Sequence, residues 1–296
     1  MKNVMKICLA GFIVLFVLSC GSSYKENVDE RNKVNAEKQR KEKAALKIAT
    51  LPTLDCLPVW VAAENGFFNN IPDSFIVKDY NSQIDIEHAL LKEQIEVGAS
   101  DTKRLEKVNE KDTVLTSLGY TNLCWILIAN KASRVNSPEK LGDKMVAMTR
   151  FSATDYLTDR VLADYPHPAT TFKIQINDVN VRLQMLQNNA MDAMWLPEPY
   201  ATAAKQMGHN QLIDSRKYDA LLAVMAVRCA DLKNSKRQKQ LNVFVEGYNR
   251  ACDSLNKNGW KQYEPLLIQH LNTTEQTLQK LPKFTFKRLN LPVNVQ

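Results

Sequence analysis

Residues 46–55 read LKIATLPTLD, and residues 61–68 continue with VAAENGFF. The first five residues form a short apolar run of the kind that becomes a buried strand. A helix over 58–67 is expected to follow, because Pro58 suits the opening turn of a helix and Gly66 suits its end. A strand followed directly by a helix is the repeating unit of α/β architecture.

The same alternation continues along the chain. Apolar or alternating runs predict further strands at 75–80, 95–99, 114–120, 124–129, 144–148, 172–176, 191–196 and 221–227. Helical patterns lie between many of these runs, and residues 231–280 are expected to be mostly helical. The predicted fold class is therefore α/β, with mainly parallel sheets flanked by helices.

The first twenty residues have the layout of a secretory signal. Two lysines precede the apolar run 7–18, and Ser19 and Cys20 close the segment. A run of this length is too short for a membrane-spanning helix, which needs about 20 apolar residues. The end of the segment resembles the lipobox of bacterial lipoproteins, which implies a signal peptide over 1–19 and a lipid on Cys20. Secretion after cleavage near the same place is the alternative.

Residues 20–45 are predicted to be a tether. The segment is almost wholly polar or charged, so it buries too little apolar surface to offset the entropy of ordering. Its Lys, Glu, Gln and Arg residues also favour a transient charged helix. In either form it would hold the folded body away from a lipid bilayer.

Composition narrows the function classes. The 296 residues carry a net charge of +7, but no stripe of Lys and Arg interleaved with aromatic residues is present, so nucleic acid is not an expected partner. The four histidines do not lie at ligand spacing to a cysteine, and no metal site is expected. No P-loop, HExxH or GxSxG motif occurs, so the sequence predicts neither a cofactor nor an enzyme.

Cysteine pairing is left open by the sequence. Cys56, Cys124, Cys229 and Cys252 remain after a signal peptide is removed. In an oxidising compartment an even number of cysteines favours disulfides, but the spacing is not that of a disulfide framework. Buried free thiols and one or two disulfides are both compatible with it, a Cys56–Cys124 bond among them.

Four stretches in one order carry a family resemblance: 46–68, 95–101 (IEVGASD), 137–157 (SPEKLGDKMVA leading to SATDYL) and 191–200 (MDAMWLPEPY). Together they resemble type II periplasmic solute-binding proteins, and more narrowly the nitrate, sulfonate, taurine and thiamine-precursor group that serves ABC importers. Two departures are that Gln94 and Asn189 stand where many relatives have glycine, and that the chain ends where relatives continue into a closing helix.

The resemblance implies two lobes around a cleft. Lobe one would hold 46–130 and 215–296, lobe two would hold 131–214, and the chain would cross between them near 128–131 and 213–221. Hinged closure on a ligand is the expected motion. The implied function is a membrane-tethered, monomeric binding protein outside the cytoplasm, in the periplasm or at the cell surface, that delivers a small polar solute to a permease and its ATPase.

Ligands of open α/β sheets sit beyond the carboxyl ends of the strands, and the residues there are the candidate site. These candidates are Asp55, Asp101, Tyr120, Arg150, Ser152, Thr154, Trp195 and Glu198. The helix start at Ser152 could hold an anionic group with help from Arg150. The mixture of carboxylates and aromatic residues favours a heteroaromatic or zwitterionic solute and weighs against nitrate or a simple sulfonate.

Each candidate also has a purely structural interpretation. Asp55 and Asp101 precede expected helices and suit the N-cap position. Ser152 and Asp155 are spaced as in a capping box. Trp195 at a strand end is commonly a core residue, and Glu198 suits the first turn of a helix. Alternative functions are an extracytoplasmic enzyme on the same fold, for which Cys56 is the candidate nucleophile, and a ligand-sensing lipoprotein without an importer.

Overall fold

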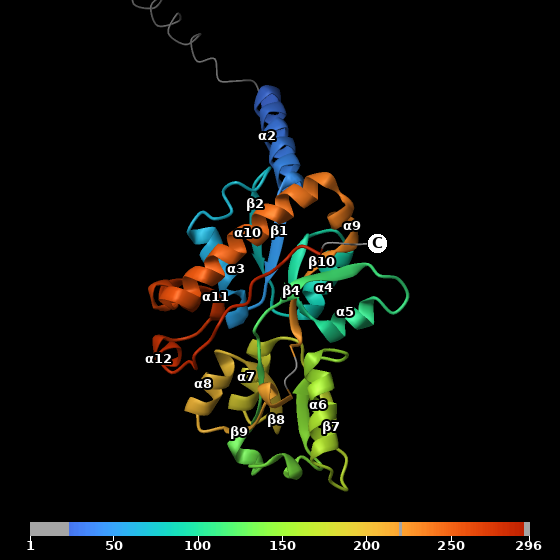
Figure 1. Ribbon diagram of the computed structural model, residues 1–296, viewed down its shortest axis with the longest axis vertical. Coiled ribbons are helices and arrows are strands. Elements are labelled where there is room, and N and C mark those ends of the chain that lie inside the picture. Colours follow the sequence, from blue (N-terminus) through green and yellow to red (C-terminus); the bar gives the residue numbers. More distant parts are fainter. Residues whose placement is uncertain (1–23, 219–220, 293–296) are drawn as a thin grey trace, which may run out of the picture. The chain divides into compact units, whose positions relative to one another are not determined.

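The computed structural model describes residues 24–218 and 221–292 (Figure 1). It separates into a segment that ends at Ala44 and a compact body that begins at Ala45. The predicted signal peptide and its lipidation site, Cys20, lie outside the described residues. Over the described ranges, no helix is both long enough and apolar enough to cross a membrane.

The predicted tether is helical where it is described. Helix α2 covers Tyr24–Ala44 and is about 31 Å long at 1.5 Å per residue. It has no apolar face, and nearly all of its side chains from residue 28 onward are exposed. Lys41 and Glu37 form an ion pair at 2.8 Å one turn apart, of a type that supports an isolated helix only weakly.

The first sheet of the body forms lobe one. Its strand order is β2-β1-β3-β10-β4, with bounds Phe75–Asp79, Leu46–Thr50, Val97–Asp101, Ala223–Arg228 and Leu115–Tyr120. Strands β1, β2 and β3 are parallel, and β10 runs antiparallel to both of its neighbours. The opening stretch 46–50 is buried along its whole length, as a central parallel strand should be.

The second sheet forms lobe two and repeats this topology. Its order is β7-β6-β8-β5-β9, with bounds Phe172–Gln175, Met145–Met148, Ala193–Pro197, Trp125–Ala129 and Asn210–Asp214. Strands β6, β7 and β8 are parallel, and β5 runs antiparallel to β8 and β9. The predicted α/β class with two mainly parallel sheets is therefore confirmed.

The strand pairing moves the first crossing between lobes. The sequence puts it near 128–131, but Trp125–Ala129 pairs with β8 and β9 and so belongs to lobe two. The chain instead crosses at 121–124. It returns between β9 and β10, after the 3₁₀ turn Ser215–Tyr218. The strand that follows each crossing is the antiparallel strand of its sheet: β5 in lobe two and β10 in lobe one.

Helices cover both sheets (Figure 1). In lobe one they are α3 (Leu57–Glu64), α4 (Gln83–Leu91), α5 (Thr102–Val108), α9 (Cys229–Lys233), α10 (Ser235–Asn258), α11 (Glu264–Leu271) and α12 (Glu275–Leu278). In lobe two they are α6 (Ala153–Asp164), α7 (Val179–Gln187) and α8 (Tyr200–Gln206). Helix α10 packs closely on the turn that follows α3, where a Cβ on Gly247 would lie only 2.8 Å from the backbone carbonyl oxygen of Phe67.

An extended segment follows α12 and packs against lobe one. The backbone N–H of Asn290 donates to the Leu118 carbonyl of β4 at 2.7 Å. The backbone N–H of Leu289 donates to the Asn249 side chain of α10, also at 2.7 Å, and the Leu289 side chain is buried. These contacts attach residues 284–290 to the body without further helix.

Candidate functional site

A small cavity lies between the lobes, where the carboxyl ends of β1, β2, β6, β7 and β8 face one another. Its volume is about 30 Å³, which is room for about two water molecules. It is lined by Leu51, Pro52, Thr53, Asn81, Ser82, Gln83, Leu123, Trp125, Thr149, Thr154, Asn177, Val179, Arg182 and Pro197. Residues from both lobes close this space, so the structure shows the lobes together.

The cavity is rich in hydrogen-bond donors. Hydroxyl and amide side chains make up most of its polar lining, and Arg182 is its one ionisable residue. No carboxylate is among the lining residues. The start of α4 also lies here, with Ser82 capping the helix by accepting from the backbone N–H of Asp85. A positive helix end and a guanidinium give the cavity a positive character.

Arg182, on α7, is the most informative residue of the cavity. It is only 2% exposed, yet no carboxylate lies within ion-pair distance in the part of the chain that the structure describes. Its guanidinium donates to the carbonyls of Ile176 (2.7 Å) and Trp195 (2.9 Å) and to Thr149 Oγ1 (2.8 Å). Burial lowers its pKa, and the charge of Asp178 offsets this only in part. A buried cation held by neutral groups costs several kcal/mol unless an anion joins it.

Arg182 is not among the site residues predicted from the sequence, although its position in the helical pattern indicates that it is buried. Arg182 stands four residues before Leu186, and positions four apart share one helix face. Leu186 is fully buried, so Arg182 occupies the inward face of α7. An arginine on the apolar face of a helix is rarely buried without a partner, and this is the feature that marks it.

Asp55 and Asp101 are both buried in lobe one and do not line the cavity. Asp55 accepts from the hydroxyls of Thr53 and Thr121, each at 2.6 Å. Burial raises the pKa of Asp55. Asp101 is the N-cap of α5, and its Oδ1 accepts from the backbone N–H of Arg104 at 2.9 Å.

Asp101 also faces the opposite lobe. Burial raises its pKa to about 6, although the backbone N–H groups of Arg104 and of Ala153, the first residue of α6, act to lower it. Its Oδ2 is buried and has no hydrogen-bond partner. The start of α6, which the sequence offers as an anion site, therefore faces a carboxylate of the protein itself.

The predicted site residues of α6 form a capping network. Ser152 is the N-cap and accepts from the backbone N–H of Thr154, while Thr154 Oγ1 accepts from the backbone N–H of Thr149. Asp155 Oδ2 accepts from the backbone N–H of Phe151. Thr154 also lines the cavity. The side chain of Arg150 is exposed and lies 5.7 Å from the Phe151 ring.

The remaining predicted residues lie apart from the cavity lining. Tyr120 is 47% exposed at the end of β4. Trp195 is fully buried, and its indole N–H donates to Thr158. Glu198 is buried and caps α8, with Oε2 accepting from the backbone N–H of Thr202 at 2.9 Å. Its own carbonyl accepts from the backbone N–H of Leu54, which joins the two lobes.

A set of contacts between α5 and α6 also joins the lobes, and we call it the α5–α6 clasp. Lys103 Nζ lies 4.9 Å from the Tyr156 ring centre, and Lys107 Nζ lies 4.7 Å from the Phe151 ring centre. Arg104, which is ion-paired with Glu87, donates to the Arg150 carbonyl at 3.1 Å. Charged side chains of lobe one thus rest on aromatic rings of lobe two.

The four described cysteines are free thiols, including Cys56 and Cys124. Burial raises the pKa of all four, to about 11 for Cys124 and about 12 for Cys252. Within residues 24–218 and 221–292, no three His, Cys, Asp or Glu side chains gather as a metal site would require.

Comparison with known proteins identifies the fold. No family model and no curated protein sequence matches the chain. Solved structures do match. The ligand-binding component of an ABC-type import system from Staphylococcus aureus, solved with zinc bound, has a TM-score of 0.69 at 15% identity, covering 83% of this chain and 86% of that one.

Two further structures agree. The alkanesulfonate-binding protein SsuA from Xanthomonas axonopodis pv. citri, bound to MOPS, has a TM-score of 0.67 at 16% identity over 83% of this chain and 87% of that one. The nitrate-binding protein NrtA from Synechocystis PCC 6803 has a TM-score of 0.68 at 14% identity, covering 79% of this chain and 68% of that one. The body therefore has the type II periplasmic binding-protein fold, as the resemblance predicted.

Proposed function

We propose that this protein is the substrate-binding subunit of an ABC importer and that it captures a small, negatively charged solute in the cleft between its lobes. The observation that carries the proposal is Arg182, a buried guanidinium beside a cavity that no carboxylate lines. Two of the similar structures bind a sulfonate or nitrate by their names, and a third serves an import system.

The placement of the carboxylates supports an anionic ligand, whereas the mixture of residue types in the sequence favoured a heteroaromatic or zwitterionic one. Asp55 and Glu198 are used within the protein, by the Thr53 and Thr121 hydroxyls and by the start of α8. What remains in the lining is the Arg182 guanidinium with hydroxyl and amide groups that can each donate. This suits an oxyanion, because charge-assisted hydrogen bonds are the strong ones. Trp125 lines the same cavity, so the predicted heteroaromatic group, as in a thiamine precursor, would lie beside the anion once the lobes open.

The proposed contacts follow from the lining. Arg182 and Thr149 would hold the anionic group, with Thr154 and Ser82 as further donors. Of the other predicted site residues, Ser152 and Arg150 stand at the start of α6 next to Thr154. The extent to which the lobes open would determine which of four further predicted residues contact a larger ligand: Arg150, Ser152, Asp101 and Tyr120.

The thiols support binding over catalysis. Cys56 is the candidate nucleophile for the alternative function, an enzyme on this fold. It is fully buried, and burial raises its pKa well above the usual value. Because the thiolate is the reactive form, this cysteine is inert.

The proposal extends to the membrane. A lipid on Cys20 would anchor the protein outside the cytoplasm, and the polar helix α2 would separate the binding body from the bilayer. A permease and its ATPase are the proposed partners, and the subunit is proposed to act as a monomer.

The test is a ligand screen with matched variants. Native mass spectrometry of the purified protein, followed by thermal shift with nitrate, alkanesulfonates, amino acids and pyrimidines, should show stabilisation by an anion. Arg182→Met should abolish that shift, because it removes the only cation of the lining. Arg160→Met is the control, since Arg160 is an exposed arginine of the same lobe and does not line the cavity.

A circular dichroism spectrum and a cooperative melt would first show that Arg182→Met folds, with Arg182→Lys as a milder change. An unaltered anion response in both Arg182 variants would overturn the proposal. So would an empty cleft together with no shift for any member of the panel.

A further inference from the structure

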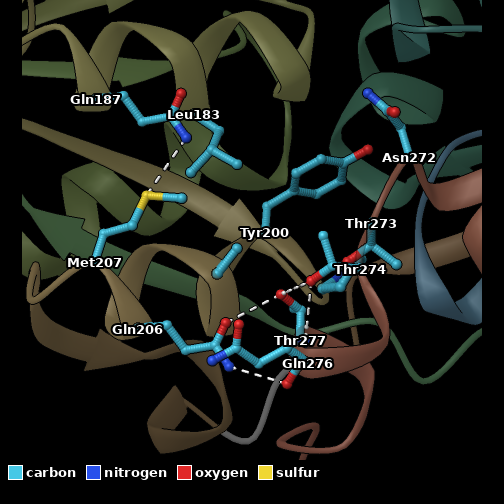
Figure 2. A pocket seen from close by; sticks show the side chains of 12 residues that line it. Leu183, Gln187, Tyr200, Gln206, Met207, Asn272, Thr273, Thr274, Gln276 and Thr277 are labelled. Atoms are coloured by element: carbon cyan, nitrogen blue, oxygen red, sulfur yellow. Dashed lines mark hydrogen bonds between the residues drawn. The ribbon is translucent and has the colours of Figure 1, made fainter.

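A second and larger cavity lies between the lobes, away from the central one (Figure 2). Its volume is about 430 Å³, against about 30 Å³ for the central cavity. This falls within the roughly 300–1,000 Å³ of typical small-molecule sites. Helices α7 and α8 of lobe two form one wall, and residues 272–277 of lobe one, around the start of α12, form the other. We call it the α8–α12 groove.

The polar lining of the groove is entirely uncharged. It presents the amides of Gln187, Gln206, Asn272 and Gln276, together with threonine hydroxyls of the 272–277 segment. Each amide offers two donors and an acceptor, which is the pattern that a pair of neighbouring ligand hydroxyls can match. An ionic ligand would find no opposite charge among these residues.

An apolar surface lies among the amides. Met207 is 37% exposed, Leu183 is half-buried, and Tyr200 is buried beneath them. Figure 2 shows these side chains from α7 and α8 opposite the threonines of lobe one. Carbon–hydrogen faces of a ring can pack on such a surface while the ring hydroxyls meet the amides.

Two of the four amides of the groove, those of Gln206 and Gln187, are already oriented by hydrogen bonds before any ligand arrives. Gln206 Nε2 donates to the Gln276 carbonyl at 3.1 Å, and Gln206 Oε1 accepts from Thr277 Oγ1 at 3.0 Å (Figure 2). Both bonds connect lobe two to lobe one, with Gln206 as the donor in the first and Thr277 as the donor in the second. Gln187 Nε2 donates to Met207 Sδ at 3.4 Å. A site whose groups are already fixed loses less entropy when it binds.

We propose that the α8–α12 groove is a second ligand site, for a neutral polyhydroxylated molecule of the sugar class. Because both lobes supply its walls, a sugar bound there stabilises the closed arrangement of the lobes. The two cavities share one segment: Pro197 lines the central cavity, while Pro199 and Tyr200 line the groove. The site stands on its own lining and does not depend on which solute the central cleft takes.

The test uses neutral sugars and charged relatives of the same shape. Isothermal titration calorimetry with glucose and trehalose should give saturable binding, and the charged pyranoses glucosamine and glucuronate should bind at least tenfold more weakly. Gln206→Leu and Gln187→Leu should each weaken sugar binding about fivefold, the loss of roughly one hydrogen bond. Gln184→Leu is the matched control, because Gln184 is an exposed residue of α7 outside the groove.

Arg182→Met separates the two sites, since it should leave the sugar affinity unchanged while the anion response is lost. The proposal fails if no neutral sugar saturates the protein up to tens of millimolar. It also fails if charged and neutral sugars bind alike, or if Gln184→Leu weakens binding as much as the groove variants do.

Discussion

The burial of Asp101 makes the charged form of its carboxylate unfavourable. It is fully buried, one of its oxygens has no partner, and its pKa is raised to about 6 by desolvation. The backbone N–H groups of Arg104 and Ala153 favour the charged form but do not outweigh the loss of water. In the closed body this residue therefore favours the protonated form more strongly than a free aspartate does.

This predicts a pH-dependent contribution to stability. An aspartate with a raised folded-state pKa is neutral in both states well below pH 4, where its burial does not lower the stability. Between about pH 4 and pH 6 the unfolded state loses its proton first, so stability falls as the pH rises. The fall is on the order of 3 kcal/mol, since one pKa unit is about 1.4 kcal/mol. Above about pH 6 it levels off.

Urea unfolding of the wild type and of Asp101→Asn from pH 4 to pH 7 measures this effect. Asparagine keeps the N-cap but cannot ionise. Relative to Asp101→Asn, the unfolding free energy of the wild type should therefore fall as the pH rises to 6. Asp55 and Asp231, whose pKa values are also raised, are present in both proteins and cancel. A difference that stays constant over this range would show that Asp101 is not buried as described.

At single residues, the sequence predicted positions better than roles. It placed Glu198 and Ser152 at the strand ends correctly, but whether a side chain points into a helix start or into a cavity depends on contacts from distant elements. The Glu198 carboxylate caps α8, which its structural interpretation had allowed. Arg182 could have been found from its place on a buried helix face, yet only the three-dimensional structure shows that no carboxylate of the described residues lies within ion-pair distance of it.

At the element scale, the α5–α6 clasp is one of several sets of contacts that hold the lobes together, beside the Leu54–Glu198 backbone bond and the Gln206 bonds to residues 276–277. A lysine over an exposed aromatic ring contributes about 0.5–1 kcal/mol. Two such contacts and the Arg104–Arg150 hydrogen bond together supply a few kcal/mol at most. This is enough to populate a closed state without ligand and weak enough for ordinary opening.

Removal of the two aromatic rings should open the lobes. In Phe151→Ala with Tyr156→Ala, the radius of gyration measured by small-angle X-ray scattering without ligand should rise, because both cation–π contacts are lost. Phe172→Ala is the control, since Phe172 is as exposed as Phe151 and lies on β7, the edge strand of the lobe-two sheet. An unchanged scattering curve for the double variant would show that the clasp does not hold the lobes.

The elements themselves were largely predictable, and the exceptions have physical causes. The sequence pattern located Trp125–Ala129 as a strand but could not say which sheet it joins, because pairing is a non-local property. The left-handed position before β3 falls on Glu93 (φ 57°) rather than on Gln94, whereas Asn189 (φ 55°) takes that role before β8 as its side chain allows. The short strand β9 carries too few apolar residues to be recognised.

At the scale of the whole protein, attachment to a membrane is a prediction that rests on Cys20. Detergent phase partitioning of cell extracts should put the full-length protein in the detergent phase. Cys20→Ala should move it to the aqueous phase, because the lipid-accepting thiol is gone. Cys8→Ala, a change inside the apolar run of the signal, is the control and should behave as the wild type does. Retention of Cys20→Ala in the detergent phase would contradict a lipid at this residue.

Binding must be coupled to opening of the two lobes, since the central cavity has room for only about two water molecules. Under the proposed function, an organic anion could enter only after the lobes part, and closure around it would then bring Arg182 the counter-charge that no carboxylate of the described residues supplies at ion-pair distance. Ligand affinity in such a protein is divided between the contacts made and the free energy of closure.

Calorimetric titration with ethanesulfonate and with the neutral ethanesulfonamide, which has nearly the same shape, separates charge from shape directly. If Arg182 waits for an anion, the sulfonate should bind at least tenfold more tightly to the wild type, and Arg182→Met should lose that preference while Arg160→Met keeps it. Equal affinity of the wild type for the two compounds, or tighter binding of the sulfonamide, would contradict an anion site in this cleft.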